Sequence, residues 1–226
     1  MTASGRAEFG PVRIAWTDAA ASVPPSRSIL ERLGEQQARR HALLRGVAAR
    51  RFLAGRALLI EVAEQLTDAT DLAFTTTCER CGADHGRPRF ERAPVAVSVT
   101  YAGSVVAVGA ARIADAAAVG VDIERAPAAG QRGPMRDLDR LFAPAPAPDI
   151  QDWTLIEAAL KADGRGITVD LAELRVGETG SGRAAGSRAI RIPGRVDTVD
   201  AQVLTGPSGF VLSAAMVPAA GAQPPG

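Results

Sequence analysis

The sequence predicts an α+β protein built from two similar halves. Two observations support this prediction: a stretch with helical periodicity precedes strand-like alternation, and the same order of elements returns further along the chain. The first occurrence begins near residue 29, and the second begins with the helical segment around Trp153. Helices and strands that are segregated in this way favour an α+β architecture over alternating βαβ winding. No exact sequence repeat accompanies the two halves.

Helices dominate the early part of the first half. Residues 11–20 read as an irregular start, and residues 29–66 that follow are rich in Leu, Ala, Arg and Glu. This segment predicts two helices, divided near Gly46. Three hydrophobic residues stand in heptad register within it: Phe52, Leu59 and Leu66.

Strands are expected next. Residues 75–88 form a predicted loop, and hydrophobic residues then alternate over residues 95–101 before a second apolar run at residues 105–114. This pattern indicates a β-hairpin. Residues 118–125 predict a third strand.

A Pro-rich spacer at residues 143–149 separates these strands from the Trp153 helix. After that helix, turn residues separate short strand-like runs that predict an antiparallel meander. The runs cover residues 171–176, 189–192, 201–204 and 210–215. We therefore expect an N-terminal half at 1–115, a C-terminal half at 116–218 and a disordered tail at 219–226.

Composition restricts the class of protein. The chain has 226 residues, of which 46% are hydrophobic and only 4% aromatic, so it can bury an aliphatic core. A net charge of +1 gives no general attraction to nucleic acid or to a membrane surface. No apolar run reaches the roughly 18 residues of a membrane span, and no signal peptide is evident. We expect a cytoplasmic monomer that binds neither nucleic acid nor membrane.

Lys161 is the single lysine among 26 basic residues. If the segment around it is helical, then Trp153, Glu157 and Lys161 lie one turn apart on one face. Lysine is a compact and rotatable donor, which suits contact with a moving phosphate group. The alternative is an exposed intrahelical ion pair with Glu157, which would contribute little to stability.

Two acidic residues share one face of the predicted third strand. Alternation sends Val121 and Ile123 to one side and Asp122 and Glu124 to the other, with the acidic Cα atoms about 7 Å apart. Such a face can simply meet water. If Glu157 lay opposite, three carboxylates would converge, and their repulsion would favour a bound divalent cation such as Mg²⁺.

These motifs carry a family resemblance. The sequence GVDIE, followed by WTLIEAALKADGRG, resembles the paired signature of the 4′-phosphopantetheinyl transferases, in particular the two-halved, monomeric surfactin-type branch. Upstream, VAARRFLAGRALL, HGRP and VSVTYAG resemble an arginine-bearing helix, a loop and a Ser-His-Ser-like turn of that family, in the same order. The resemblance spans roughly residues 39–166.

The resemblance assigns expected roles to individual residues. It implies magnesium ligands at Asp122, Glu124 and Glu157, with Glu157 and Lys161 as the catalytic pair. It also implies that coenzyme A contacts basic and polar residues elsewhere. These cofactor-binding candidates are Arg51, Arg87, Arg56, Thr100 and Tyr101.

The implied fold has two pseudo-symmetric α/β halves, and the implied activity is that of a holo-carrier-protein synthase. The enzyme would transfer the 4′-phosphopantetheine arm of coenzyme A to a serine of an apo acyl or peptidyl carrier protein, with Mg²⁺ as cofactor and adenosine 3′,5′-bisphosphate as product. Carriers of this kind serve fatty acid, polyketide or nonribosomal peptide synthesis.

Two positions depart from the family pattern. Tyr101 stands where the family usually has histidine, and Ile156 stands where many members have a basic residue. Both departures support an alternative, a degenerate paralogue that binds carrier protein or coenzyme A without catalysis. An unrelated α+β binding module is a further alternative. Separately, Cys78, Cys81 and His85 offer three zinc ligands without an evident fourth.

Overall fold

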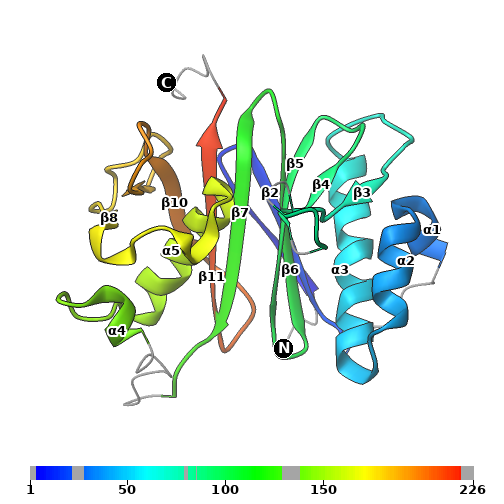
Figure 1. The fold of residues 1–226 in the computed structure, drawn as a ribbon, viewed down its shortest axis with the longest axis horizontal. Helices are drawn as coiled ribbons and strands as arrows, with labels where there is room; N and C mark the ends of the chain where they lie inside the picture. The colour runs from blue at the N-terminus through cyan, green and yellow to red at the C-terminus, as the bar shows by residue number, and fades with distance from the viewer. Residues whose placement is uncertain (1–3, 22–27, 79–80, 85, 129–137, 220–226) are drawn as a thin grey trace.

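Two antiparallel sheets and five α-helices make up the described part of the protein, which confirms the predicted α+β class (Figure 1). The structure is a computed structural model, and it describes residues 4–21, 28–78, 81–84, 86–128 and 138–219. The expected C-terminal tail lies outside these residues, apart from residue 219.

The first sheet has six strands in the order β1-β2-β6-β5-β4-β3. At its centre is the predicted hairpin, whose turn includes Gly103 with φ of +59°. The strands are β1 (Ser4–Phe9), β2 (Val12–Asp18), β3 (Phe74–Thr75), β4 (Arg89–Phe90), β5 (Val95–Ala102) and β6 (Val105–Arg112).

The expectation of an irregular N-terminal segment was wrong. Residues 4–18 form the β1–β2 hairpin, and β2 pairs with β6 from Arg13 to Asp18. The hydrophobic side chains of Val12, Ile14 and Trp16 point into the core, so their burial determines the conformation of this segment.

Three helices, rather than the predicted two, follow β2. They are α1 (Ser28–Leu33), α2 (Glu35–Ala42) and α3 (Gly46–Glu64). The additional break falls at Gly34, whose φ of +92° cannot continue a right-handed helix. The predicted division at Gly46 is confirmed, and α3 packs Leu59 and Ala63 against the first sheet.

The second sheet has five strands in the order β7-β11-β10-β9-β8. The chain passes from one sheet to the other between β6 and β7. The strands are β7 (Ala116–Arg125), β8 (Arg175–Val176), β9 (Arg188–Arg191), β10 (Val199–Leu204) and β11 (Phe210–Pro218).

The prediction of a strand at residues 171–176, the first of the expected meander, was mostly wrong. Residues 171–173 form a 3₁₀ turn, and only Arg175–Val176 pair as a strand. The side chain of Asp170 accepts a hydrogen bond from the backbone N–H of Ala172 at 3.0 Å, which stabilises the start of that turn.

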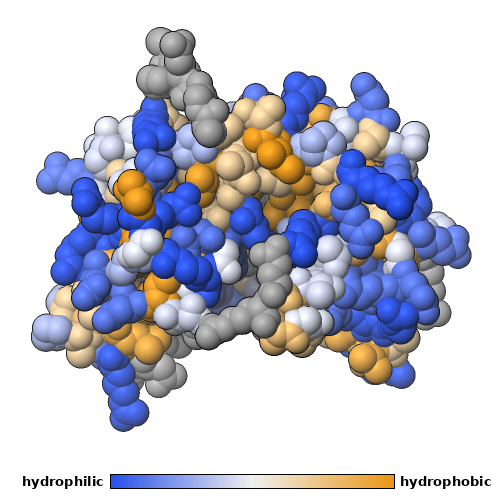
Figure 2. All heavy atoms as spheres, turned by 45° about the horizontal axis from the view of Figure 1, so that its top comes forward, coloured by the Kyte–Doolittle hydropathy of each residue, from blue (hydrophilic) through white to orange (hydrophobic). Residues whose placement is uncertain are grey.

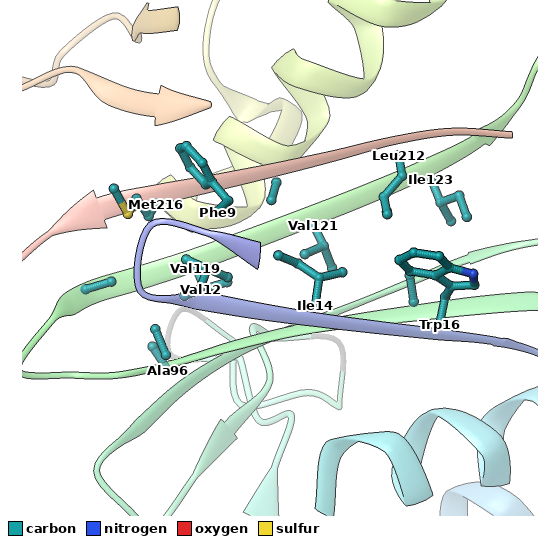
Figure 3. Close-up of a cluster of buried hydrophobic side chains, with 14 of the residues drawn as sticks. Phe9, Val12, Ile14, Trp16, Ala96, Val119, Val121, Ile123, Leu212 and Met216 are labelled. Atoms are coloured by element: carbon teal, nitrogen blue, oxygen red, sulfur yellow. The ribbon is translucent and has the colours of Figure 1, made fainter. Parts of the chain in front are cut away.

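The two sheets face one another across a shared hydrophobic core (Figure 3). Ile14 and Trp16 of β2 meet Val121 and Ile123 of β7 there, with Leu212 of β11 beside them. Helix α3 covers the outer face of the first sheet, whereas α5 (Ile150–Asp163) covers the outer face of the second (Figure 1). The short helix α4 (Asp139–Phe142) precedes α5.

Helix α5 lies unusually close to β7. A Cβ atom built on Gly120 would stand 1.9 Å from the carbonyl oxygen of Ala158 and 2.7 Å from the amide nitrogen of Ala162. Only glycine allows this approach, which fixes the distance between the acidic strand and the helix that carries Glu157 and Lys161.

Figure 2 shows hydrophilic residues over much of this face, with hydrophobic residues in separate patches between them. Within the described residues, none of the helices combines the length and apolarity needed to cross a bilayer.

Candidate functional site

Helix α5 positions the catalytic candidates. Its first residues are capped by Asp149, whose carboxylate accepts a hydrogen bond from the Asp152 N–H at 2.9 Å. Gly164, with φ of +90°, ends the helix. The predicted helical segment is therefore confirmed, and Glu157 and Lys161 stand one turn apart within it.

The ammonium group of Lys161 contacts the acidic strand directly. Its Nζ donates to Oδ1 of Asp122 at 2.5 Å and to Oγ1 of Thr100 at 3.2 Å. The Thr100 hydroxyl in turn donates to the same Asp122 oxygen at 3.0 Å. Strands β5 and β7 and helix α5 thus meet at one hydrogen-bonded triangle, and Lys161 is not the exposed intrahelical pair of the simpler interpretation.

Asp122 is a buried carboxylate, and one of its two oxygens has no hydrogen-bond partner among the described residues. The residue is only 4% exposed, and its Oδ2 is buried with no hydrogen-bond partner in the described part of the protein. A buried carboxylate oxygen without a partner is costly. Its available lone pairs are suited to a cation.

Glu124 and Glu157 lie in the electrostatic field of this triangle. Burial raises the pKa of Glu157; Lys161 opposes the rise, and the charges of Asp122 and Glu124 add to it. The pKa of Glu124 is raised by burial and by Asp122, with Lys161 again opposing. All three predicted carboxylates therefore interact.

Their chemistry fits a divalent cation, because Mg²⁺ prefers carboxylate oxygens and would relieve their repulsion. As placed, no three His, Cys, Asp or Glu side chains among the described residues are close enough together to hold a metal ion. The ammonium of Lys161 contacts Asp122 instead.

Arg87 contacts the C-terminal end of the same helix, close to Lys161. Its Nη1 donates to the carbonyl oxygen of Ala162 at 3.4 Å, and burial lowers the pKa of its guanidinium, with Asp163 opposing. Arg87, Lys161 and Gly164 line a pocket of about 240 Å³. A group bound in this pocket would meet two cationic side chains.

Arg51 and Tyr101 form a second cationic element, between α3 and the end of β5. The guanidinium of Arg51 lies 5.3 Å from the centre of the Tyr101 ring, and its Nη1 donates to the Gly103 carbonyl oxygen at 2.9 Å. Both side chains are half-buried. Tyr101 therefore supports Arg51 through its aromatic face.

Arg56 is enclosed, with only 3% of its surface exposed. Its guanidinium lies 4.2 Å from the ring centre of Phe52, and its Nε donates to Gln37 Oε1 at 2.9 Å. Its Nη1 donates to the Tyr101 hydroxyl at 3.4 Å. In this arrangement Arg56 reaches the Arg51–Tyr101 pair from inside the protein.

Trp153 and Ile156 support the helix from the hydrophobic core. Trp153 packs edge-on against Phe142, with ring centres 6.1 Å apart. Ile156 is 2% exposed and belongs to the core beneath α5, so the residue at this position points away from solvent.

The zinc alternative lies partly beyond the described chain. Cys78 is half-buried and Cys81 is exposed, but His85 lies outside the described residues.

The sequence interpretation missed the contribution of Ser98. Its buried hydroxyl accepts a hydrogen bond from the Val121 N–H at 3.1 Å and so joins β5 to β7 beside the acidic pair. The available signal was alternation, because Ser98 and Thr100 are the polar positions of an otherwise apolar strand.

No protein-family model and no curated protein sequence matches this chain.

Proposed function

We propose that this protein is a 4′-phosphopantetheinyl transferase with two pseudo-symmetric halves. It would move the phosphopantetheine arm of coenzyme A to a serine hydroxyl of an apo acyl or peptidyl carrier protein. The observation that carries the proposal is the meeting of Lys161 with Asp122, beside two further carboxylates, at positions where the sequence motifs resemble those of this family.

In this reaction the serine oxygen attacks the β-phosphorus of coenzyme A. A new phosphorus–oxygen bond forms, the bond from that phosphorus to the bridging oxygen breaks, and adenosine 3′,5′-bisphosphate leaves. Magnesium would neutralise the charge that develops on the pyrophosphate oxygens. Asp122, Glu124 and Glu157 are the residues that would hold it.

Glu157 would accept the serine proton. Its burial supports this role because the raised pKa makes the carboxylate a stronger base than an exposed glutamate. Lys161 would contact the transferred or departing phosphate, because an ammonium on a flexible stem can rotate toward it and this side chain is 32% exposed.

Arg51 and Arg87 would hold the nucleotide end of coenzyme A. Arg51 is half-buried against Tyr101, and Arg87 lines the pocket next to Lys161. Guanidinium groups form bidentate hydrogen bonds with phosphate, which suits the anionic nucleotide.

A degenerate paralogue is the second candidate, and two residues favour it. Tyr101 holds Arg51 by its ring in place of the family's usual histidine, and Ile156 is buried where a basic residue is common. Against it, a protein that only binds its partner has no physical need to keep Lys161 and three acids together.

A panel of apo acyl and peptidyl carrier proteins tests the proposal. Each carrier is incubated with the protein, coenzyme A and magnesium, with and without chelator, and its intact mass is measured. We expect a chelator-sensitive gain of one phosphopantetheine arm on at least one carrier. If coenzyme A binds but no carrier gains mass, the degenerate binder is the better account.

A further inference from the structure

We propose that Lys161 acts as an internal cation that holds Asp122 until a divalent metal ion displaces it, and that this displacement frees its ammonium for the substrate phosphate. This inference rests on the proposed function for the identity of the metal. It assigns Lys161 two successive positions in one site.

The contacts of Asp122 define the first position. Lys161 and Thr100 both occupy Oδ1, at 2.5 Å and 3.0 Å, while Oδ2 has no hydrogen-bond partner among the described residues. Among the described residues, the ammonium group therefore supplies the one positive charge in direct contact with this buried carboxylate. Thr100 holds the ammonium there through the 3.2 Å hydrogen bond.

A metal ion and this ammonium compete for the same carboxylate. Magnesium binds carboxylate oxygens at ~2.1 Å. A dication at that distance from Asp122, with the lysine nitrogen 2.5 Å from the same side chain, would bring like charges together in a poorly screened environment. A metal ion on the free Oδ2 would therefore repel the ammonium on Oδ1 and favour its withdrawal.

The side chain of Lys161 can move into an adjacent pocket. It is 32% exposed, whereas that of Asp122 is 5% exposed, so the lysine end of the pair is the one that can move. Lys161 also lines the pocket that contains Arg87. A displaced ammonium would therefore enter the space where an anionic ligand would bind.

The acidic neighbours respond to the same charge. The ammonium of Lys161 pairs with Asp122, and Glu157 stands one turn before Lys161 on α5. Its positive charge therefore lowers the repulsion among these carboxylates in the absence of metal. Removal of the lysine leaves three acids with no compensating ammonium, which strengthens their attraction for a dication.

Metal affinity without substrate tests the inference. Isothermal titration with MnCl₂ and with MgCl₂ is performed on the wild-type protein and on Lys161→Met, which keeps the apolar stem and removes the charge. We expect Lys161→Met to bind the metal roughly tenfold more tightly, or better, because a competing unit charge is gone. Equal or weaker binding by this variant would overturn the proposal.

Arg165→Met is the matched control. Arg165 lies four residues after Lys161, just beyond the end of α5, and pairs with Asp163 at 2.7 Å, not with Asp122. The substitution removes one positive charge close by, so it reports any general electrostatic effect. We expect its metal affinity to stay within about twofold of wild type, since an exposed charge outside the site is screened.

The single lysine of the chain allows a direct observation. Lysine-selective ¹³C,¹⁵N labelling gives NMR signals from one side chain, Lys161. We expect these signals to shift in parallel with metal binding as MgCl₂ is added. If calorimetry shows a saturated site and the signals have not moved, Lys161 has not been displaced and the inference fails, although a metal site and the proposed transferase remain.

If neither wild type nor Lys161→Met binds Mg²⁺ or Mn²⁺, the metal assignment fails, and the proposed function fails with it.

Discussion

Gly120→Ala is predicted to push α5 away from the acidic strand. The new Cβ would lie 1.9 Å from the Ala158 carbonyl oxygen, whereas Cβ atoms essentially never approach another heavy atom closer than 3.0 Å. The atoms that obstruct it belong to the backbone of a buried helix, so a side-chain rotation cannot relieve the contact. The helix must therefore retreat by about 1 Å, at a cost of about 1–3 kcal/mol for an overpacked core.

This shift would also loosen the site. Lys161 is carried by the displaced helix, and Asp122 by the strand that stays, so the 2.5 Å contact between them would lengthen. Misplacement of about 1 Å can cost on the order of 100-fold in rate. We therefore expect the transfer rate per folded molecule to fall together with stability.

Urea unfolding and the carrier-transfer assay measure the two effects. Ala117→Val is the control, because residue 117 is an exposed position on the same strand and can accept a larger side chain. A Gly120→Ala protein whose free energy of unfolding lies within about 0.5 kcal/mol of wild type would refute the packing argument. A destabilised variant with an unchanged rate per folded molecule would refute the link to catalysis.

Three further predictions concern single side chains. Lys161→Ala should lower turnover more than it weakens coenzyme A binding, because the ammonium acts on the transferring phosphate. Steady-state kinetics measure turnover and calorimetry measures coenzyme A binding. Equal losses in turnover and in binding would contradict a role of Lys161 in the transfer step. Asp163→Asn should lower the free energy of unfolding by about 1–3 kcal/mol at neutral pH. Burial opposes ionisation of Asp163, but hydrogen bonds from Arg165 and Arg195 lower the pKa of its carboxyl below 3.8. The stability that these bonds contribute is therefore present above pH 3.8 and is lost as the pH falls through the lowered pKa. Denaturation curves for Asp163→Asn and wild type should therefore converge in acid, and a difference that persists there would contradict the assignment. Tyr101→Phe should change the KM for coenzyme A by less than about threefold, whereas Tyr101→Ala should raise this KM about tenfold, because the guanidinium of Arg51 packs on the ring. Equal effects of the two substitutions on KM would show that the hydroxyl, and not the ring, supports coenzyme A binding.

Strong local periodicity explains why much of the fold could be predicted. The β5–β6 hairpin, the division at Gly46 and the helix around Trp153 each have a pattern that local sequence carries. The β1–β2 hairpin was missed although Val12, Ile14 and Trp16 alternate, and its position was set by pairing with the distant strand β6. Tertiary contacts of this kind are not visible in a local window.

The site shows the same division between local and distant information. Alternation correctly placed Asp122 on the face opposite to Val121, and helical spacing correctly placed Glu157 and Lys161 together. The contact between Lys161 and Asp122 depends on how closely the helix packs on the strand, which Gly120 determines. Nothing in the sequence near Lys161 specifies that distance.

Arg56 illustrates a different difficulty. Arginine on a helix is usually solvent-exposed, and here Phe52 and Gln37 enclose it together with Tyr101. Phe52 precedes Arg56 by one turn of the same helix, but Gln37 and Tyr101 come from α2 and β5, so the full burial of this charge follows from the packed fold.

The most direct test of the central claim is the stoichiometry of the transfer reaction. A responsive apo carrier is incubated with coenzyme A and magnesium, and holo-carrier and adenosine 3′,5′-bisphosphate are quantified together for wild type and for Asp122→Asn. The account predicts equal amounts of both products from wild type and a large loss of both from the variant. Coenzyme A that remains intact with every carrier, or an Asp122→Asn protein as active as wild type, would contradict it.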